Sequence, residues 1–314
     1  MRAVSCSDGA VEVVEAPEPS TAGITVHVRA AGICGSDLHL VEGRFVDGTV
    51  LGHEIAGVTD DGTFVAVEPV ISCGTCGFCE AGDNGLCSQA AASTIGIGLD
   101  GGMAERVRVP AHLIVPLPPG VDVADASLVE PLAVAVRALA RVDVGPSTRV
   151  AVVGGGAIGL CAVAVARHLG AEVELIARHD HQRSAGERLG ASAPTDQPAD
   201  VVVEAAGTAS ALAAAVSRCR PGGKVAIPGT YWEPVELPGL EMGMKEISLV
   251  PSIMYGRTSG PRDVEVGAEI LAHDPEVART LITHRFPLDG AVDAFAVAAD
   301  RAAGSIKVVL EPPG

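Results

Sequence analysis

The spacing of apolar positions changes once along the chain, at the proline-rich segment 116–120. Before this segment, short runs of alternating apolar and polar residues are separated by Gly, Pro and Asp, a pattern typical of β-strands and turns. These runs occupy residues 25–29, 64–67 and 105–109. After it, the apolar spacing lengthens over 124–141, and strand-like segments then alternate with helix-like ones. The pattern predicts a β-rich part followed by an α/β part.

The α/β part contains four apolar runs typical of buried strands and one glycine-led run typical of a helix. The strands are predicted at 149–153, 173–177, 200–204 and 224–228, and the helix at 157–169. Strands separated by helices predict a parallel sheet with right-handed crossovers. The last segment predicts a helix at 292–303 and a strand at 306–310, which can return to the first part of the chain.

Length, charge and cysteine usage narrow the class of protein. A chain of 314 residues exceeds the usual size of one hydrophobic core, so two domains are expected. The net charge of −17 comes with no basic stripe, which argues against nucleic-acid binding. No run is apolar enough for a membrane helix and no export signal is visible, so we expect a cytoplasmic enzyme. Eight cysteines, four of them crowded together, indicate metal binding rather than disulfides.

The crowded cysteines are spaced for a closed metal site. They follow one another at intervals of three, three and eight residues, with glycines between them, and are Cys73, Cys76, Cys79 and Cys87. Four thiolates in a tetrahedron are the usual ligands of a structural zinc, and they leave no open position for chemistry. The alternative, four unligated cysteines, would leave a costly density of reactive thiols.

A second cluster has the composition of a catalytic zinc site. Cys34 and His53 are two suitable ligands, although each alone is also a common buried residue. A catalytic zinc needs a third protein ligand and one open position. We favour Glu130, at the start of a helical stretch, with Glu54 as an exchangeable ligand or a neighbour of the ligands.

Three polar residues near Cys34 suit supporting roles. Asp37 is expected to accept the free ring N–H of His53 and so to orient that ligand. Ser36 and His39 are expected to carry the proton of an alcohol to solvent through a hydroxyl and an imidazole. The alternative is that these residues only stabilise a turn.

A glycine-rich fingerprint follows the first strand of the α/β part and opens its helix. Such a turn lets the backbone approach a pyrophosphate, and the helix N-terminus favours the negative charge. The residues expected to contact a dinucleotide there are Gly154, Gly155, Gly156, Ala157, Ile158 and Gly159.

The end of the next strand indicates which dinucleotide is preferred. An NAD site usually has an acidic residue there, whereas this strand ends at Ala177 and Arg178. Glu174 lies three residues earlier and should point away from the ribose. Arg178 can pair with a 2′-phosphate, with Arg183 as a second cation, so NADP is predicted in preference to NAD. The alternative is a surface arginine and an enzyme that accepts both cofactors.

Together these motifs resemble the zinc-containing medium-chain alcohol dehydrogenase family, in particular its sorbitol, butanediol and threonine dehydrogenase-like branch. The likeness covers nearly the whole chain. It rests on segments 32–39 and 52–54, the four cysteines, Glu130-Pro131-Leu132, the glycine fingerprint and the closing segment 304–309.

The resemblance implies an α/β protein with a partly open GroES-like β-barrel catalytic domain and a Rossmann domain, the active site lying in the cleft. Residues 1–125 and 284–314 would form the first domain, and 126–283 the second. The resemblance also implies that Lys307 approaches the phosphates of the cofactor. It further implies a homodimer or homotetramer, formed through edge strands of the dinucleotide domains.

We therefore expect a zinc-dependent oxidoreductase, with two zinc ions per chain, that transfers a hydride between an alcohol or polyol and NADP. The zinc would act as a Lewis acid that lowers the pKa of the alcohol. Two alternatives are a zinc-independent NADPH reductase of the same fold and a non-catalytic NADPH-binding regulatory protein. Tyr231, Trp232 and Phe45 are candidates for the substrate pocket.

Overall fold

The computed structural model describes residues 1–20, 22–257 and 260–313 and divides into two compact units. Unit 1 comprises residues 1–130 and 256–314, and unit 2 comprises 131–255. The second boundary therefore lies at 256 rather than at the expected 284. The reason is local: Arg262 pairs with Glu68 and donates to the carbonyl of Ile114, which attaches the following helices to unit 1.

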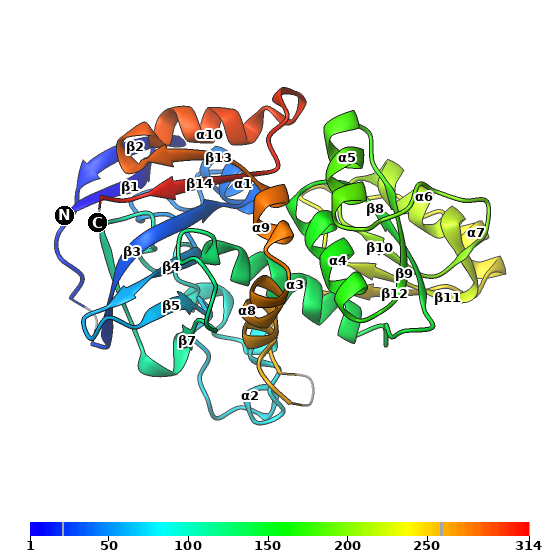
Figure 1. The fold of residues 1–314 in the computed structure, drawn as a ribbon, viewed down its shortest axis with the longest axis horizontal. Helices are drawn as coiled ribbons and strands as arrows, with labels where there is room; N and C mark the ends of the chain where they lie inside the picture. The colour runs from blue at the N-terminus through cyan, green and yellow to red at the C-terminus, as the bar shows by residue number, and fades with distance from the viewer. Residues whose placement is uncertain (21, 258–259, 314) are drawn as a thin grey trace. The chain divides into compact units, whose positions relative to one another are not determined.

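Unit 1 is built on a seven-stranded mixed sheet and a separate two-stranded hairpin (Figure 1). The sheet order is β13-β14-β3-β4-β5-β7, with β6 also paired to β3, and the hairpin is β1-β2. The strands are β1 (Arg2–Ser7), β2 (Ala10–Glu15), β3 (Ile24–Ile33), β4 (Glu54–Thr59), β5 (Phe64–Val67), β6 (Arg106–Val109), β7 (Ile114–Pro116), β13 (Ile282–Pro287) and β14 (Lys307–Glu311).

Short helices surround this sheet. The α-helices are α1 (Gly35–Glu42), α2 (Gly77–Glu80), α8 (Asp263–His273), α9 (Glu276–Leu281) and α10 (Ala291–Ala299). The 3-10 turns are η1 (Asn84–Leu86), η2 (Ala91–Ser93), η3 (Ala111–Leu113), η4 (Ala126–Leu128), η5 (Leu288–Gly290) and η6 (Arg301–Ala303). Helix α3 (Val129–Ala140) begins in unit 1 and continues into unit 2.

The C-terminal strand β14 lies beside the strand that leads into the candidate zinc site. It pairs antiparallel with β3, with Val308 opposite Ile33 and Val309 opposite Gly32. Apolar side chains from both strands, including Val28 and Leu310, are fully buried in one core. Burial of that apolar surface is the main force that brings the two ends of the chain together.

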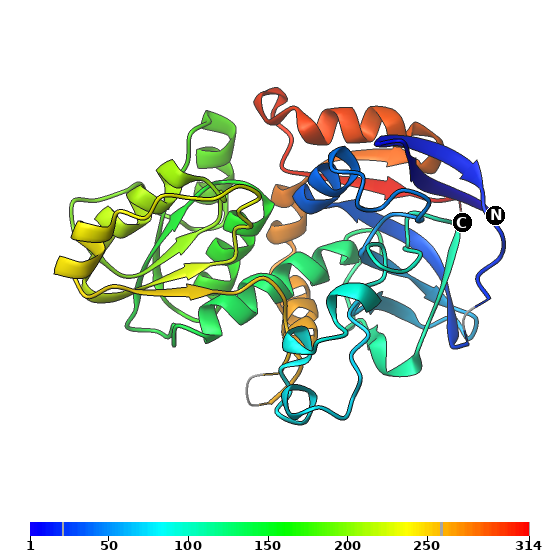
Figure 2. The same ribbon diagram turned by 180° about the vertical axis from the view of Figure 1, so that it is seen from behind.

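Unit 2 is a doubly wound parallel sheet. Its strand order is β12-β11-β10-β8-β9, and α4 covers one face of the sheet while α6 covers the other (Figures 1 and 2). The strands are β8 (Arg149–Val153), β9 (Glu172–Ile176), β10 (Ala199–Glu204), β11 (Cys219–Ile227) and β12 (Ser248–Pro251). The helices are α4 (Ala157–His168), α5 (Asp180–Arg188), α6 (Ala209–Arg218) and α7 (Gly239–Met244).

The strand order of unit 2 reverses direction between β8 and β10. The chain runs from β8 outward to β9, returns, and then runs outward on the other side through β10, β11 and β12. A crevice at the carboxyl ends of the strands beside such a reversal is where doubly wound sheets bind ligands. Across the described ranges, no helix is long and apolar enough to cross a membrane.

Candidate active site and metal centres

Cys34 lies at the junction of β3 and α1, where a capping arrangement holds it in place. It is the N-cap residue of α1, and its backbone N–H donates to Asp37 Oδ2 at 2.9 Å. The Asp37 side chain is 1% exposed, whereas Cys34 is only half-buried. The cap therefore fixes the backbone of Cys34 while its thiol stays accessible to a ligand.

His53 faces the same aspartate from the start of β4. Its Nδ1 lies 3.3 Å from Asp37 Oδ1, and in the described chain neither of these buried atoms has a hydrogen-bond partner. Burial alone would lower the pKa of His53, but the charge of Asp37 and the nearby Cys34 outweigh it and raise that pKa well above its ordinary value. With Nδ1 directed at the carboxylate, Nε2 is the nitrogen available to a metal ion.

Glu54 completes a group of possible metal ligands. One ligand atom from each of Cys34, His53 and Glu54 lies within 4.8 Å of the other two. The Glu54 carboxylate is completely buried, in a space that exists because Gly32 has no side chain: a Cβ there would overlap Glu54 Oε2. Sulfur, imidazole and carboxylate are a donor set that zinc accepts.

Glu130 is not part of this group, although the sequence favoured it as the third ligand. It is 7% exposed at the second position of α3, and the groups of possible ligands in the described ranges do not include it. The structure brings Glu54 to Cys34 and His53, whereas Glu130 lies outside the group whose ligand atoms are within 4.8 Å of one another. His53 directly precedes Glu54, the first residue of β4, so the start of this strand places both residues at the site.

Lys307 has a different partner from the one that the family resemblance implied. Its Nζ lies 2.6 and 2.8 Å from the two carboxylate oxygens of Glu54 and donates to the carbonyl of Ile33 at 3.1 Å. The lysine is 2% exposed. A carboxylate as buried as Glu54 needs a compensating charge, and the pairing of β14 with β3 places Lys307 next to it. In this structure the ammonium group is directed at Glu54.

Ser36 and His39 both lie on α1, three residues apart and therefore on one side of the helix. Both side chains are half-buried. Ser36 follows Cys34 by two residues, and both side chains remain partly accessible to solvent. The geometry allows a proton relay without requiring one.

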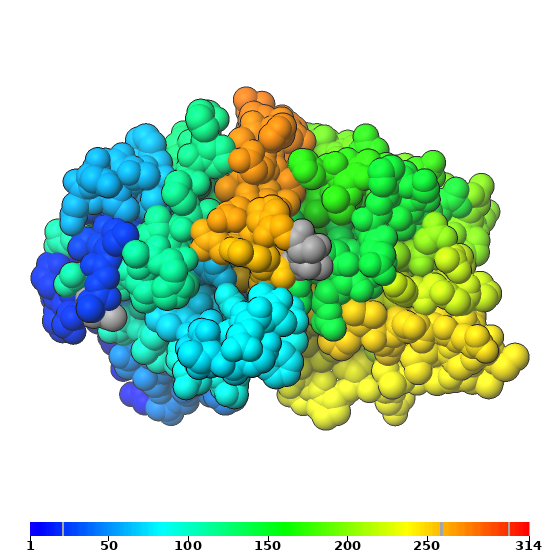
Figure 3. All heavy atoms as spheres, turned by 90° about the horizontal axis from the view of Figure 1, so that it is seen from below, coloured from blue at the N-terminus to red at the C-terminus, as the bar shows by residue number. Residues whose placement is uncertain are grey.

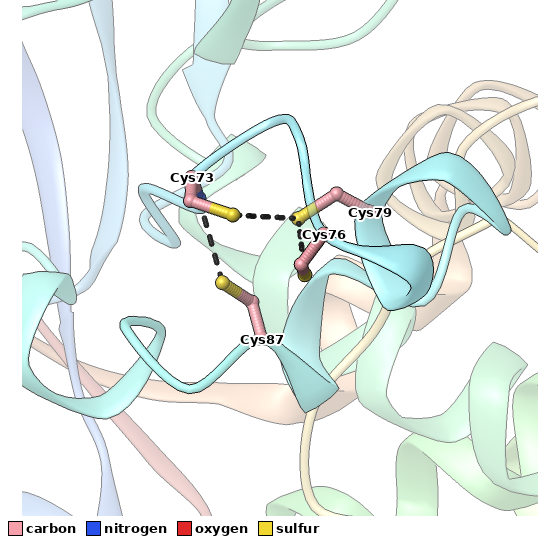
Figure 4. Close-up of side chains that lie close together, drawn as sticks. All are labelled: Cys73, Cys76, Cys79 and Cys87. Atoms are coloured by element: carbon pink, nitrogen blue, oxygen red, sulfur yellow. Dashed lines mark hydrogen bonds between the residues drawn. The ribbon is translucent and has the colours of Figure 1, made fainter.

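The other four cysteines form a compact cluster (Figure 4). Their sulfur atoms all lie within 4.8 Å of one another, with Cys73 and Cys79 3.8 Å apart and Cys76 and Cys79 3.5 Å apart. These distances exceed a disulfide bond, which is about 2.05 Å long. A tetrahedron with zinc–sulfur distances of about 2.3 Å has edges of about 3.8 Å, so the cluster fits a zinc ion.

Hydrogen bonds around the cluster shift the pKa values of its thiols in opposite directions. The backbone of Cys79 acts to lower the pKa of Cys76, but side-chain hydrogen bonds with the neighbouring thiols and burial outweigh it and raise that pKa to about 11. The backbone N–H and hydroxyl of Thr75, helped by Cys76, lower the pKa of Cys73 to about 6. The pKa of Cys79 is also lowered, mainly by Ser72. The segment that contains the cluster lies on the surface of unit 1 in the space-filling view, where it is cyan (Figure 3). A metal ion held by these four thiolates would stabilise the loop.

The glycine fingerprint forms the turn from β8 into α4, and its glycines serve different purposes. Gly154 has a φ of +110°, which disfavours any other residue. A Cβ on Gly159 would overlap the carbonyl oxygen of Gly154, so the helix packs directly on the turn. A Cβ on Gly156, the N-cap of α4, would meet only open space. That space beside a helix N-terminus fits a pyrophosphate.

Two arginines lie just after the end of β9, and their side chains are placed differently. Arg178 is exposed, and Ala177 packs against the turn, since a Cβ on Gly155 would lie 2.8 Å from Ala177 Cβ. Arg183 instead donates to the carbonyls of Ala177 and Arg178, each at 2.9 Å, and pairs with Asp180. Arg183 therefore holds the loop that presents Arg178, and its guanidinium group is already occupied.

Glu174 is excluded from a ribose-binding role. The side chain is 4% exposed, accepts a hydrogen bond from Arg218 Nε at 2.6 Å and accepts another from the N–H of Thr195. Its hydrogen bonds are made within unit 2, with Arg218 and Thr195.

The sequence did not indicate the roles of two further residues, Glu204 and Tyr231. Glu204, at the end of β10, is completely buried and accepts a hydrogen bond from the hydroxyl of Tyr231 at 2.7 Å. Tyr231 was considered only as a pocket residue. A carboxylate directly after an apolar strand is the signal that could have drawn attention to Glu204. Phe45, another pocket candidate, is 72% exposed.

Comparison with known families agrees with this geometry. The model of the alcohol dehydrogenase GroES-like domain matches residues 20–119, and that of the zinc-binding dehydrogenases matches residues 157–269. The L-galactonate-5-dehydrogenase of Escherichia coli K12 is 31% identical over 303 residues, which cover 87% of each chain. The chain belongs to the zinc-containing medium-chain alcohol dehydrogenase family. It is therefore an oxidoreductase that acts on CH–OH groups.

Solved structures of zinc-type alcohol dehydrogenases and their relatives share the fold. A putative zinc-binding dehydrogenase from Sinorhizobium meliloti 1021, bound to NADP, has a TM-score of 0.86 and 31% identity, with 99% of each chain covered. A short-chain alcohol dehydrogenase from Escherichia coli CFT073, in complex with NADH, has a TM-score of 0.88 and 27% identity over the same shares. The expected GroES-like and Rossmann architecture is confirmed.

Proposed function

We propose that the protein is a two-zinc dehydrogenase that oxidises an alcohol or polyol with NADP, or reduces the matching carbonyl compound. The convergence of Cys34, His53 and Glu54 in a chain that also carries a closed four-cysteine site is the observation that supports it. A zinc-independent reductase or a regulatory protein would not need the ligand set formed by Cys34, His53 and Glu54.

The roles of the residues follow from their positions. Zinc held by Cys34, His53 and a carboxylate supplies Lewis acidity, and a bound nicotinamide supplies the hydride acceptor. Asp37 fixes the ring of His53 through Nδ1. The hydroxyl of Ser36 would accept the proton of the alcohol while releasing its own proton toward His39, which would pass a proton to solvent.

We propose Glu54, not Glu130, as the third protein ligand. Glu54 is the carboxylate that lies within 4.8 Å of Cys34 and His53, and Lys307 holds it in place.

Zinc analysis paired with an alcohol and polyol screen tests the function. We expect two zinc ions per chain by elemental analysis and reduction of NADP in the presence of at least one secondary alcohol. One zinc per chain with no turnover would favour a regulatory protein. One zinc with reductase activity would favour the zinc-independent enzyme.

We propose NADP rather than NAD as the preferred cofactor. The support is the exposed Arg178 at the end of β9, where Ala177 replaces an acidic side chain and Arg183 braces the loop. A guanidinium group pairs well with the 2′-phosphate of NADP, whereas a carboxylate there would repel it.

Replacing Arg178 with Ala is expected to raise the Kd for NADPH by about 10- to 100-fold, because a charge-assisted contact is worth about 1.5–3 kcal/mol. The Kd for NADH should change less than about twofold. Isothermal titration with both nucleotides measures this. Arg167→Ala, which removes an exposed arginine at the far end of α4, is the control. Equal effects on both nucleotides would contradict the assignment.

We also propose a homodimer or homotetramer and a cytoplasmic location. Strand β12 lies at an edge of the sheet of unit 2, and an unpaired edge is a template for a second copy. Large apolar side chains are exposed near it: Leu237, Leu240, Met244 and Ile253. Helix α7 forms part of the surface of unit 2, shown in yellow in Figure 3. Eight free cysteines suit a reducing compartment.

A further inference from the structure

Glu204 is a buried carboxylate with an unusual set of partners. It is completely buried at the carboxyl end of β10. Its Oε1 accepts hydrogen bonds from the N–H groups of Ala206 and Gly207, each at 2.9 Å. Its Oε2 accepts one from the hydroxyl of Tyr231 at 2.7 Å. Burying a carboxylate is costly without compensation, and in the described chain these donors, rather than a cation, provide it.

The carboxylate joins the loop after β10 to the loop after β11. Tyr231 belongs to the second loop, and the N–H of Gly229 donates to the backbone carbonyl of Glu204 at 3.2 Å. The two loops meet without room for a side chain, since a Cβ on Gly229 would lie 2.8 Å from the nitrogen of Gly207 and 2.9 Å from Glu204 Oε2. The bond with Glu204 also raises the pKa of Tyr231, after burial itself, so the phenol remains a donor.

The loop after β10 also touches the glycine fingerprint. The N–H of Ala205 donates to the carbonyl of Val153 at 2.9 Å, and a Cβ on Gly154 would lie 3.0 Å from the nitrogen of Ala206. Glu204 therefore holds together the ends of β8, β10 and β11. These ends lie on the same edge of the parallel sheet, where its ligands bind (Figure 1).

The strand order indicates where each half of a dinucleotide would lie along this edge, on either side of the reversal between β8 and β10. The adenosine ribose lies at the end of the second strand of such a sheet, here β9. The other mononucleotide half then lies beyond the reversal, against the ends of β10 and β11. This is the half that carries the nicotinamide.

We propose that Glu204 is a positioning residue that, with Tyr231, holds the two loops against which the nicotinamide half of the cofactor binds. The inference rests on the proposed dinucleotide-linked function. Glu204 does not touch the reacting atoms. It acts through the N–H groups of Ala206 and Gly207 and through the phenol of Tyr231.

Fragment binding separates this role from a general effect on folding. NADPH and 2′-phospho-ADP-ribose, which lacks the nicotinamide, are titrated calorimetrically into the zinc-loaded wild type and into Glu204→Gln and Tyr231→Phe. We expect the Kd for NADPH to rise by about 5- to 20-fold in Glu204→Gln and about threefold in Tyr231→Phe, since lost hydrogen bonds are worth about 0.5–1.5 kcal/mol each. The Kd for 2′-phospho-ADP-ribose should change less than about twofold in both.

Glu174→Gln is the matched control. It removes another buried carboxylate from unit 2, one bonded to Arg218, and should not change the ratio of the two Kd values. Equal weakening of both ligands by Glu204→Gln and Tyr231→Phe, or no weakening of either, would overturn the proposal. If Glu204→Gln does not fold, Tyr231→Phe still provides the ratio, because it removes one hydroxyl and no charge. A wild type that binds neither ligand would instead refute the proposed function itself.

Discussion

Replacing Cys34 with Ser, or His53 with Ala, lowers kcat by about a thousandfold or more while the fold remains intact. These residues contribute two of the three protein ligands of the proposed catalytic zinc, and a thousandfold corresponds to about 4 kcal/mol of transition-state stabilisation. The effect is measured as kcat with the best alcohol substrate, together with zinc content and the thermal unfolding profile.

Matched substitutions show whether this loss is specific. Cys6→Ser alters another buried cysteine of unit 1, outside both clusters and bonded to Asp47, and should keep kcat within about threefold. His27→Ala removes an exposed histidine paired with Asp60 and should behave likewise. Each active-site variant should keep one zinc, held by the four cysteines. Retained turnover in Cys34→Ser or His53→Ala would refute zinc-centred catalysis.

Replacing Lys307 with Met is expected to lower the free energy of unfolding by about 3–5 kcal/mol, because it removes the cation that neutralises a completely buried carboxylate. The measurement is reversible denaturant unfolding after chelation of any metal beside Glu54, because a zinc ion there would also neutralise the carboxylate. Adding Glu54→Gln to the same chain should recover a large part of the loss, since the uncompensated charge then disappears.

The control for this prediction is Lys224→Met. Lys224 pairs with Asp143 at 2.7 Å, but both side chains are exposed to solvent, so its loss should cost less than about 1 kcal/mol. Lys307→Arg keeps the charge, so its loss of unfolding free energy should lie between those of Lys307→Met and Lys224→Met. If Lys307→Met cost no more than Lys224→Met, some group other than Lys307 would have to balance the charge of Glu54.

Features that depend on short segments were predictable from the sequence. The four cysteines lie within one loop, so their spacing alone predicted that the thiols converge, and the structure shows a cluster of zinc-sized dimensions. The helix predicted at 157–169 is α4 (Ala157–His168), because the glycine turn and the apolar run belong to one strand–helix unit. The α/β class followed from the alternation of such units and is confirmed.

The choice of partners across long stretches of chain was not predictable. Glu54 and Glu130 have equivalent chemistry, and only the packing of β4 beside β3 shows which carboxylate lies near Cys34. Lys307 and Glu54 are 253 positions apart, so no local pattern links them. The structure pairs Lys307 with Glu54, a contact that the sequence did not indicate.

The sequence by itself determined the ligand types, the fingerprint turn and the order of β8, α4, β9, β10 and β11 around it. These depend on backbone geometry and apolar periodicity within a few turns of chain. Only the tertiary structure decided which groups compensate the charged side chains. Lys307 pairs with Glu54, Arg183 donates to carbonyl groups of its own loop, and Tyr231 donates to Glu204. A buried charge needs a compensating partner, and that partner can come from any part of the chain that the fold brings near. The burial of apolar side chains assembles the fold, but the apolar pattern of the sequence does not show which polar groups will lie together.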